Sequence, residues 1–338
     1  MTKKTLTIVQ IILLTFLGSC KNNDRNFGEV KNLSSYKTTD FITTLETKIS
    51  KDKNSIYCAT FLFAWDEVRN KIKTPIQIKK NFTDLNIINN SKSFIGTLKN
   101  DEYFASVEIK GNSIIADAKF EKTLSFETSF VSYDKELNFK GVAVESFGSH
   151  GFDYDINKMI GILYYENDNN FILKLQPKDK AHEILLFKPE KEFNTISEMY
   201  SEVEKLISIG KAMNMGNNNW KYSLLEDDKV IIPKINFNIK GDFKNIVGNT
   251  FSSNQNEYLI EKAWQRTAFI LDESGAKIES EAATQVATLS LEDVNIEKPK
   301  PKKMVFDKPF LLLLKRVDSD NPYFAVWMND SELMTKNN

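Results

Sequence analysis

The sequence predicts an α+β fold of mixed, mostly antiparallel β-sheets with packed helices. Over residues 137–187, short apolar runs alternate with polar turns rich in Asn and Asp, a pattern typical of antiparallel strands joined by hairpins. Residues 195–198, with the sequence TISE, form a capping box that opens an amphipathic helix. Two apolar runs, 310–314 and 323–328, are separated by a turn containing Asn-Pro and predict a final pair of strands.

The N-terminus has the features of a bacterial lipoprotein signal. Two lysines precede an apolar stretch over residues 8–17, and a glycine and a serine then lead directly to Cys20. This order predicts a signal peptide, residues 1–19, whose removal leaves a lipidated Cys20. The apolar stretch is shorter than the roughly 20 residues that a membrane-spanning helix requires. An ordinary signal peptide followed by an incidental cysteine is the alternative.

One large domain is expected after the signal. We assign residues 20–35 to a polar tether, 36–330 to the folded domain and 331–338 to a tail. The 45 basic and 46 acidic residues give a formal net charge of -1, which provides no long-range field to attract nucleic acid, so we exclude nucleic acid as a partner. We expect a monomer held at the cell envelope by the lipid on Cys20. Lys21 after that cysteine favours the outer membrane or cell surface.

No catalytic or metal-binding pattern is visible in the sequence. The two histidines, His150 and His182, belong to no nucleophile, base or zinc-ligand arrangement. Cys58 is the only thiol left once Cys20 is acylated, and its apolar surroundings favour a buried, inert thiol over a reactive one. We therefore expect no metal, no cofactor and no enzymatic activity.

The first part of the domain is expected to contain two helices and a strand. Apolar residues at helical spacing predict an amphipathic helix over 40–49, with Thr39 as its N-cap. The run 56–65 is apolar nearly all round, which favours a helix buried in the core. Apolar residues with period two over 106–115, around Gly111, predict a strand.

The second part of the domain adds one helix and several strands. The helix that begins at the capping box is expected to stop at Gly210, because glycine is common just after a helix C-terminus. Strands are then predicted over 230–237 and 264–271, before the final pair. The leucine run 311–314 has no polar face, so its strand should be covered on both sides.

The last third of the chain resembles the serpin family. Residues 267–275, with the sequence TAFILDESG, are similar to the end of the serpin strand that leads into the reactive loop. Glu273 and Gly275 fall on the hinge glutamate and the hinge glycine of that pattern. Residues 305–314 and 323–328 look like the last two strands of the family.

Earlier segments resemble the family in the same order. Asn112 precedes residues 120–122, which are similar to a Trp-Glu-Lys corner of the family, and Pro233 with Lys234 matches a Pro-Lys-Phe strand. The resemblance implies a serpin-like fold, with Asn112 at the place where the main sheet must part to admit the loop. The interval 69–106 is shorter than the several helices and two strands of a full serpin require. We therefore expect fewer elements than in a full serpin.

The segment after the hinge has the alternation that strand insertion requires. A serpin inhibits when its loop, once cut, inserts as a new strand into its own sheet, and such a strand needs small or apolar side chains on its inner face. One face of this segment carries Ala276, Ile278, Ser280, Ala282 and Thr284. The other face carries Lys277, Glu279, Glu281 and Ala283. An exposed helix or an ordinary edge strand is the alternative for this sequence.

The resemblance also places a reactive bond in the loop-like segment 275–304. Family spacing puts this bond between Leu289 and Ser290, and a leucine before the cut suits chymotrypsin-like or elastase-like proteases. The loop is longer than usual and ends in a run rich in Lys and Pro. We interpret that run as a solvated, extended linker, with a basic bait for trypsin-like proteases at Lys302 or Lys303 as the alternative.

The function that this resemblance implies is protease inhibition without catalysis. The chain would be a suicide substrate for a serine or cysteine protease, displayed on the cell envelope. One alternative is a non-inhibitory serpin-like surface lipoprotein that binds a partner protein. Another is an envelope lipoprotein of unrelated fold.

Overall fold

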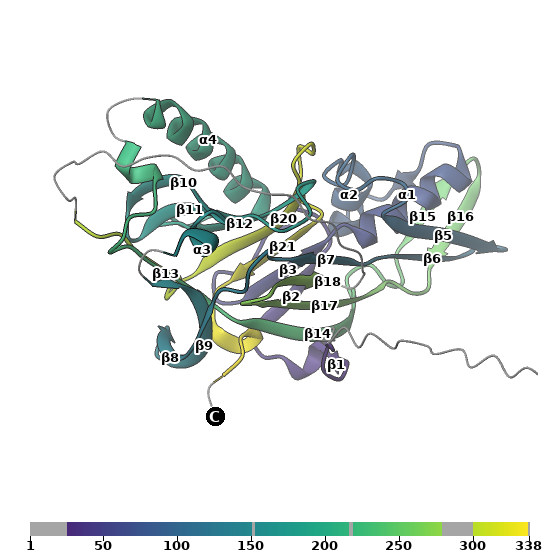
Figure 1. Ribbon diagram of the computed structural model, residues 1–338. Helices are drawn as coiled ribbons and strands as arrows, with labels where there is room; N and C mark the ends of the chain where they lie inside the picture. Colours follow the sequence, from purple (N-terminus) through teal and green to yellow (C-terminus); the bar gives the residue numbers. More distant parts are fainter. Residues whose placement is uncertain (1–25, 151–152, 216–218, 279–299, 337–338) are drawn as a thin grey trace, which may run out of the picture.

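The computed structural model describes residues 26–150, 153–215, 219–278 and 300–336 (Figure 1). These residues form an α+β fold with four mixed, mostly antiparallel sheets and a small number of helices, which confirms the predicted fold class. Within them, no helix combines the length and the apolar character needed to cross a membrane.

A seven-stranded sheet lies at the centre of the hydrophobic core. In spatial order its strands are β10 (Ile160–Asn167), β11 (Asn170–Leu175), β12 (His182–Lys188), β20 (Phe310–Arg316), β21 (Phe324–Met328), β3 (Asn54–Cys58) and β2 (Thr39–Ile42). The antiparallel neighbours β10, β11 and β12, and the pair β20 and β21, confirm the predicted hairpins. Every residue of β20 is buried, as expected for a strand covered on both faces.

A five-stranded sheet contains the predicted hinge. In spatial order its strands are β1 (Lys31–Asn32), β14 (Ile235–Asp242), β17 (Trp264–Asp272), β18 (Gly275–Ile278) and β7 (Lys122–Ser125). Phe269 of β17 packs against Phe324 of β21, with ring centroids 4.8 Å apart, so this sheet and the seven-stranded sheet share one core. β1 lies within the segment assigned to the tether, so the folded part begins before residue 36.

Two smaller sheets and four helices complete the described fold. One sheet has the order β19 (Lys303–Val305), β13 (Lys229–Pro233), β9 (Val142–His150) and β8 (Val131–Phe139). The other has the order β4 (Gln77–Ile78), β15 (Thr250–Ser253), β16 (Asn256–Ile260), β6 (Ser113–Phe120) and β5 (Tyr103–Lys110). The α-helices in the described residues are α1 (Thr60–Ile72), α2 (Thr83–Asn90), α3 (Tyr154–Asn157) and α4 (Ile196–Asn214), and short 3-10 helices lie at Leu33–Ser35, Asn219–Tyr222 and Ser331–Leu333. In Figure 1, α1 lies against β5 and β6, and α4 lies over β10.

The helix predicted from the capping box is present as α4. Thr195 Oγ1 accepts a hydrogen bond from Glu198 N at 3.0 Å, and the Glu198 carboxylate accepts one from Asn194 N at 2.8 Å. The predicted stop at Gly210 is wrong, because α4 continues beyond it. A Cβ atom on Gly210 would lie 2.0 Å from the carbonyl oxygen of Leu163 in β10. Glycine is therefore needed there for close packing of the helix on the sheet.

The helix predicted over 40–49 is also wrong. Residues 39–42 form β2, which pairs in parallel with β3, and turns follow it. Leu45 and Ile49 are buried as expected, but they project from these turns. Threonines around the segment disfavour a helix because they are branched at Cβ and can bond to nearby backbone, so pairing with β3 decides the structure.

Two further predicted elements are divided in the structure. The run 56–65 contains the end of strand β3 and the start of α1 at Thr60, since a short apolar run does not distinguish a buried strand from a helix. The strand expected over 106–115 is a hairpin of β5 and β6. Gly111 lies in its turn with φ +59°.

The strands predicted between the capping-box helix and the hinge are confirmed in part. Residues 264–271 lie in β17, as expected. The strand predicted over 230–237 is interrupted at Lys234, and its two parts, β13 and β14, belong to different sheets. The chain therefore passes from one sheet to the other at Lys234. The side chain of this lysine lies beside Glu273 of the predicted hinge.

Candidate functional site at the hinge of the five-stranded sheet

A tight turn joins β17 to β18 at the predicted hinge. Asp272 Oδ1 accepts a hydrogen bond from Ser274 N at 2.8 Å and closes this turn. Gly275 has φ +133°, and a Cβ atom on it would lie 2.3 Å from the carbonyl oxygen of Leu124 in β7. Both the backbone conformation and the close approach of β7 therefore require glycine at this position.

An ion pair fastens the hinge turn to the adjacent chain. Glu273 Oε2 lies 2.9 Å from Lys234 Nζ and forms an ion pair with it. Glu145 Oε2 lies 3.4 Å from the same ammonium group. Burial alone would lower the pKa of Lys234, but the two carboxylates outweigh burial and raise it. The structure thus brings together Glu273 and Lys234, which the sequence matched to the family separately.

Strand β18 occupies a central position, because it pairs with β17 on one edge and with β7 on the other. Ala276 and Ile278 are buried, whereas Lys277 between them is partly exposed. The Lys277 ammonium lies 5.3 Å from the ring centroid of Phe27. Small and apolar side chains of β18 therefore point inward, and its charge points outward. The remaining inner-face residues of the predicted segment, Ser280, Ala282 and Thr284, lie outside the described residues.

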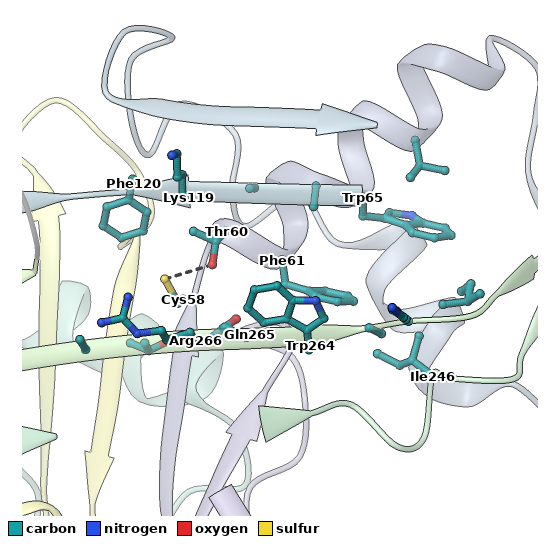
Figure 2. A pocket seen from close by; sticks show the side chains of 18 of the residues that line it. Cys58, Thr60, Phe61, Trp65, Lys119, Phe120, Ile246, Trp264, Gln265 and Arg266 are labelled. Carbon is teal, nitrogen blue, oxygen red and sulfur yellow. Dashed lines mark hydrogen bonds between the residues drawn. The ribbon is translucent and has the colours of Figure 1, made fainter. Parts of the chain in front are cut away.

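A cavity of about 330 Å³ continues the line of β18 beyond Ile278. Figure 2 shows this cavity from close by, with two strand walls and a helix between them. Residues 264–268 of β17 form one wall, and residues 118–121 at the end of β6 form the other. Side chains of α1, including Phe61 and Trp65, form the floor. We call this cavity the slot.

The register of β18 leads directly into the slot. Lys277 pairs with Ile270 of β17 on one side and with Thr123 of β7 on the other. The next positions on the same line therefore lie opposite residues 268 to 264 and residues 121 to 118, which are the residues of the two walls. The ladder between β17 and β18 covers the last three residues of β17, whereas β14 pairs with residues 264–271 of β17. The slot thus lies where a continuation of β18 would run, between β17 and the end of β6.

Two cations flank one position of the slot on the outer face of the sheet. In the register of β18, the position four residues beyond Lys277 falls opposite Arg266 of β17 and opposite Lys119 of β6. Both side chains are exposed and lie on opposite sides of the slot (Figure 2). Directly opposed residues on neighbouring strands lie close enough for their side chains to interact. An anionic side chain at this position would therefore meet a cation on each side.

Other predicted site residues lie away from the hinge or outside the described residues. Asn112 is in the exposed turn of the β5–β6 hairpin, where its carbonyl oxygen accepts a hydrogen bond from Leu259 N at 3.0 Å. This turn is at the end of β6 remote from β7, so the structure does not bring Asn112 together with the hinge. Cys20, Leu289 and Ser290 lie outside the described residues.

A buried ion pair anchors the chain after the loop-like segment. Lys302 Nζ lies 2.6 Å from Asp228 Oδ2, and these side chains are 1% and 0% exposed. Lys302 N also donates to Asp228 Oδ1 at 2.7 Å, and Lys302 Nζ donates to Trp220 O at 3.0 Å. Lys303 then begins β19, which pairs with β13. The alternative bait at Lys302 or Lys303 is contradicted, because a protease needs an accessible chain on both sides of the bond that it cuts.

A single cysteine, Cys58, lies among the residues that line the slot. Cys58 is buried at its edge, and burial raises the pKa of its thiol to about 11. This confirms the expected burial of Cys58. Among the residues that the structure describes, no group of three or more His, Cys, Asp or Glu side chains is arranged to hold a metal ion.

Comparisons with known proteins give similarity to serpins at the level of structure. No family model and no curated protein matches the sequence. The chain is similar to serpin-12 of Manduca sexta, with 12% identity, a TM-score of 0.40 and coverage of 66% of this chain and 57% of that one. It is also similar to thyroxine-binding globulin in complex with thyroxine, with 13% identity, a TM-score of 0.37 and coverage of 76% and 65%. A tumour-suppressing serpin gives 13% identity, a TM-score of 0.36 and coverage of 64% and 56%. The chain therefore spans less than two thirds of the length of each of these proteins.

Proposed function

We propose that the chain is a serpin-like protease inhibitor whose loop, once cut by a serine or cysteine protease, enters the slot as a continuation of β18. The protease would be held as an acyl-enzyme while its active site is distorted, so the chain would be a suicide substrate. The observation that carries this proposal is the cavity among the described residues that continues the line of β18 in register.

The residue types of the loop support entry into the slot. Continued in register, Ser280 and Ala282 would point inward above α1, where small side chains are needed. Glu281 would point outward between Lys119 and Arg266. Cross-strand pairs of opposite charge contribute roughly 0.2–1 kcal/mol each, so this position favours entry and fixes its register.

The anchor at Lys302 supports the same proposal from the other end of the loop. The hinge turn holds the chain before the loop, and the buried pair with Asp228 holds the chain after it. A cut between Leu289 and Ser290 would release the first part from this second anchor. The released part could then extend β18, while the part after the cut stays with β19.

The proposal is tested with the form that lacks residues 1–20. We would incubate it with chymotrypsin-like and elastase-like proteases, look for an SDS-stable complex, and measure the thermal midpoint of the cleaved chain. The expected result is a covalent complex and a higher midpoint after cleavage. Cleavage with neither complex nor gain in stability would reject inhibition by insertion.

A matched pair of charge reversals tests the register. Glu281→Lys would place a third cation between Lys119 and Arg266, so we expect less complex and more simple cleavage. Glu279→Lys makes the same chemical change at a position opposite Glu121, where a cation is tolerated. Equal complex formation by the two variants would contradict the assigned register.

One observation favours the alternative of a non-inhibitory surface protein that binds a partner. Strand β18 already lies in the sheet of the uncut chain, so less strand remains to be inserted. In this case the slot would stay open after cleavage, and the scaffold would act through its surface. The same complex and stability measurements separate the two functions.

We also propose that the chain is displayed on the cell envelope through a lipid on Cys20. The support is the order of the signal in the sequence, with its small residues before the cysteine. Expression of the full chain in a bacterial host with labelled palmitate should give a labelled protein in the membrane fraction. Cys20→Ser should abolish the label and release the chain, and retention of the label would contradict lipidation at this cysteine.

A further inference from the structure

A buried cluster of charged groups centres on Glu102, just before β5. Glu102 Oε1 accepts a hydrogen bond from Lys122 Nζ at 2.6 Å and lies 3.2 Å from His182 Nε2. Its Oε2 accepts hydrogen bonds from Arg316 Nη1 and Lys99 N, each at 2.9 Å. The side chains of Glu102, Lys122 and Arg316 are 14%, 17% and 6% exposed, and His182 is fully buried. Each oxygen of the carboxylate therefore has two donors.

The cluster connects β7 to the layer beneath it. Lys122 is the first residue of β7, and in the ladder it pairs with Ile278, the last residue of β18. Its side chain points inward, as that of Leu124 does, because alternate residues of a strand share a face. His182 begins β12 and Arg316 ends β20, both in the seven-stranded sheet. Glu102 thus ties β7 to that sheet at the point where β18 ends and the slot begins.

Strand β7 has few other attachments. It is the outer strand of its sheet, and among the strands that the structure describes it pairs with β18 alone. Glu121 alone separates it from β6, which forms a wall of the slot. Lys122 is therefore one of the contacts that place the end of that wall relative to β17, together with the pairing of β6 with β5 and β16.

We propose that Glu102 is a positioning residue. It holds β7 and the adjoining end of β6 one strand position away from β17, and His182 is its proton-sensitive partner. A wall that is already in place lowers the entropic cost of strand entry, because less of the protein must be ordered when the strand arrives. The consequence for strand entry rests on the proposed function, whereas the contact with β7 does not.

The surroundings of His182 make the contact sensitive to acid. The geometry assigns the Nε2–H tautomer, which donates to Glu102, and leaves Nδ1 buried without a hydrogen-bond partner among the described residues. Burial first, and then the charge of Lys122, lower the pKa of His182, so the ring is neutral at pH 7. The charged and titratable groups that face it are Glu102, Lys122, Asp179, Arg316 and Tyr323. A proton on the ring would add a cation beside Lys122 and compete with it for Glu102.

Hydrogen–deuterium exchange of residues 122–125 tests the positioning role. In Glu102→Gln we expect protection of these amides to fall about tenfold, the change that corresponds to loss of one charge-assisted hydrogen bond. Glu108→Gln, an exposed change on the neighbouring β5, is the matched control and should leave protection unchanged. Unchanged protection in Glu102→Gln would overturn the proposal. An equal loss across β12 and β20 would also overturn it, because that result indicates general destabilisation.

The pH dependence provides a readout that a merely structural role would not move. Because the pKa of His182 lies below its ordinary value of 6.5, the protection factor of β7 in the wild-type chain should fall only as the pH is lowered below that value, and His182→Gln should remove this pH-dependent difference. A difference that persists in His182→Gln would reject the histidine as the sensor.

The effect on strand entry is measured separately. After loop cleavage, the gain in thermal stability should develop about tenfold more slowly in Glu102→Gln than in the wild-type chain. An equal rate in the two chains would reject a role of Glu102 in strand entry. If the wild-type chain shows no gain at all, the proposed function fails, while the exchange result still decides whether Glu102 positions β7.

Discussion

Removal of the Asp228 charge, which anchors the chain after the loop, should lower the free energy of unfolding more than removal of an exposed charge nearby. Asp228 and Lys302 are both buried, and their charged atoms are 2.6 Å apart. In Asp228→Asn, the ammonium group of Lys302 stays buried without an anion beside it, near the carbonyl oxygen of Trp220 at 3.0 Å and two aromatic rings. Breaking a buried ion pair by removing one partner costs about 3–5 kcal/mol. Because the amide keeps the size and one acceptor oxygen of the carboxylate, we expect about 3 kcal/mol.

The assay is equilibrium unfolding in urea, followed by circular dichroism. Asp227→Asn is the matched control, because Asp227 is exposed next to Asp228 and should change the free energy of unfolding by less than about 0.5 kcal/mol. The double variant Asp228→Asn, Lys302→Met removes both charges and should recover most of the loss, since an apolar side chain can fill the same space. A loss below about 1 kcal/mol in Asp228→Asn, or no recovery in the double variant, would refute the reasoning.

Two further predictions concern the hinge and the cluster at β7. Gly275→Ala should lower the free energy of unfolding by about 2 kcal/mol or more, because the new Cβ would meet the carbonyl oxygen of Leu124 at 2.3 Å at a residue with positive φ. Gly161→Ala is the matched control: it lies in an ordinary strand with no contact below 3.6 Å and should cost far less in the same urea assay. Burial alone would raise the pKa of Glu102, but the hydrogen bonds from Lys122 and Lys99 lower it to about 2. The stability that the ionised Glu102 carboxylate contributes is therefore complete above its ordinary pKa of 4.5 and is lost as the pH falls toward 2. The difference in unfolding free energy between the wild-type chain and Glu102→Gln should therefore shrink across this window, and a constant difference would contradict the assignment.

Local signals in the sequence predicted the elements that depend on local physics. Polar turns located the hairpins over 137–187, and the capping box located α4, because both are decided by residues close together in the chain. Gly275 was found through the resemblance to the family, and the structure adds the physical reason, since a residue with positive φ so close to a neighbouring strand must be glycine.

Elements that depend on distant partners could not be predicted in this way. Apolar spacing over 40–49 indicated burial, but parallel pairing with β3 turned its start into a strand. Lys302 stands among lysines and prolines that are typical of a solvated linker, and its buried partner Asp228 lies 74 residues earlier. The opposition of Lys119 and Arg266 across the slot likewise follows from strand register, which the sequence does not contain.

The most direct test of the account is hydrogen–deuterium exchange of residues 264–268 in β17, before and after cleavage of the loop. These residues form the wall of the slot next to the end of β18. Entry of the cut loop would give their slot-facing amides new strand partners, so the account predicts slower exchange in the cleaved chain. Unchanged exchange in a fully cleaved chain would contradict it, because the slot would then have stayed open.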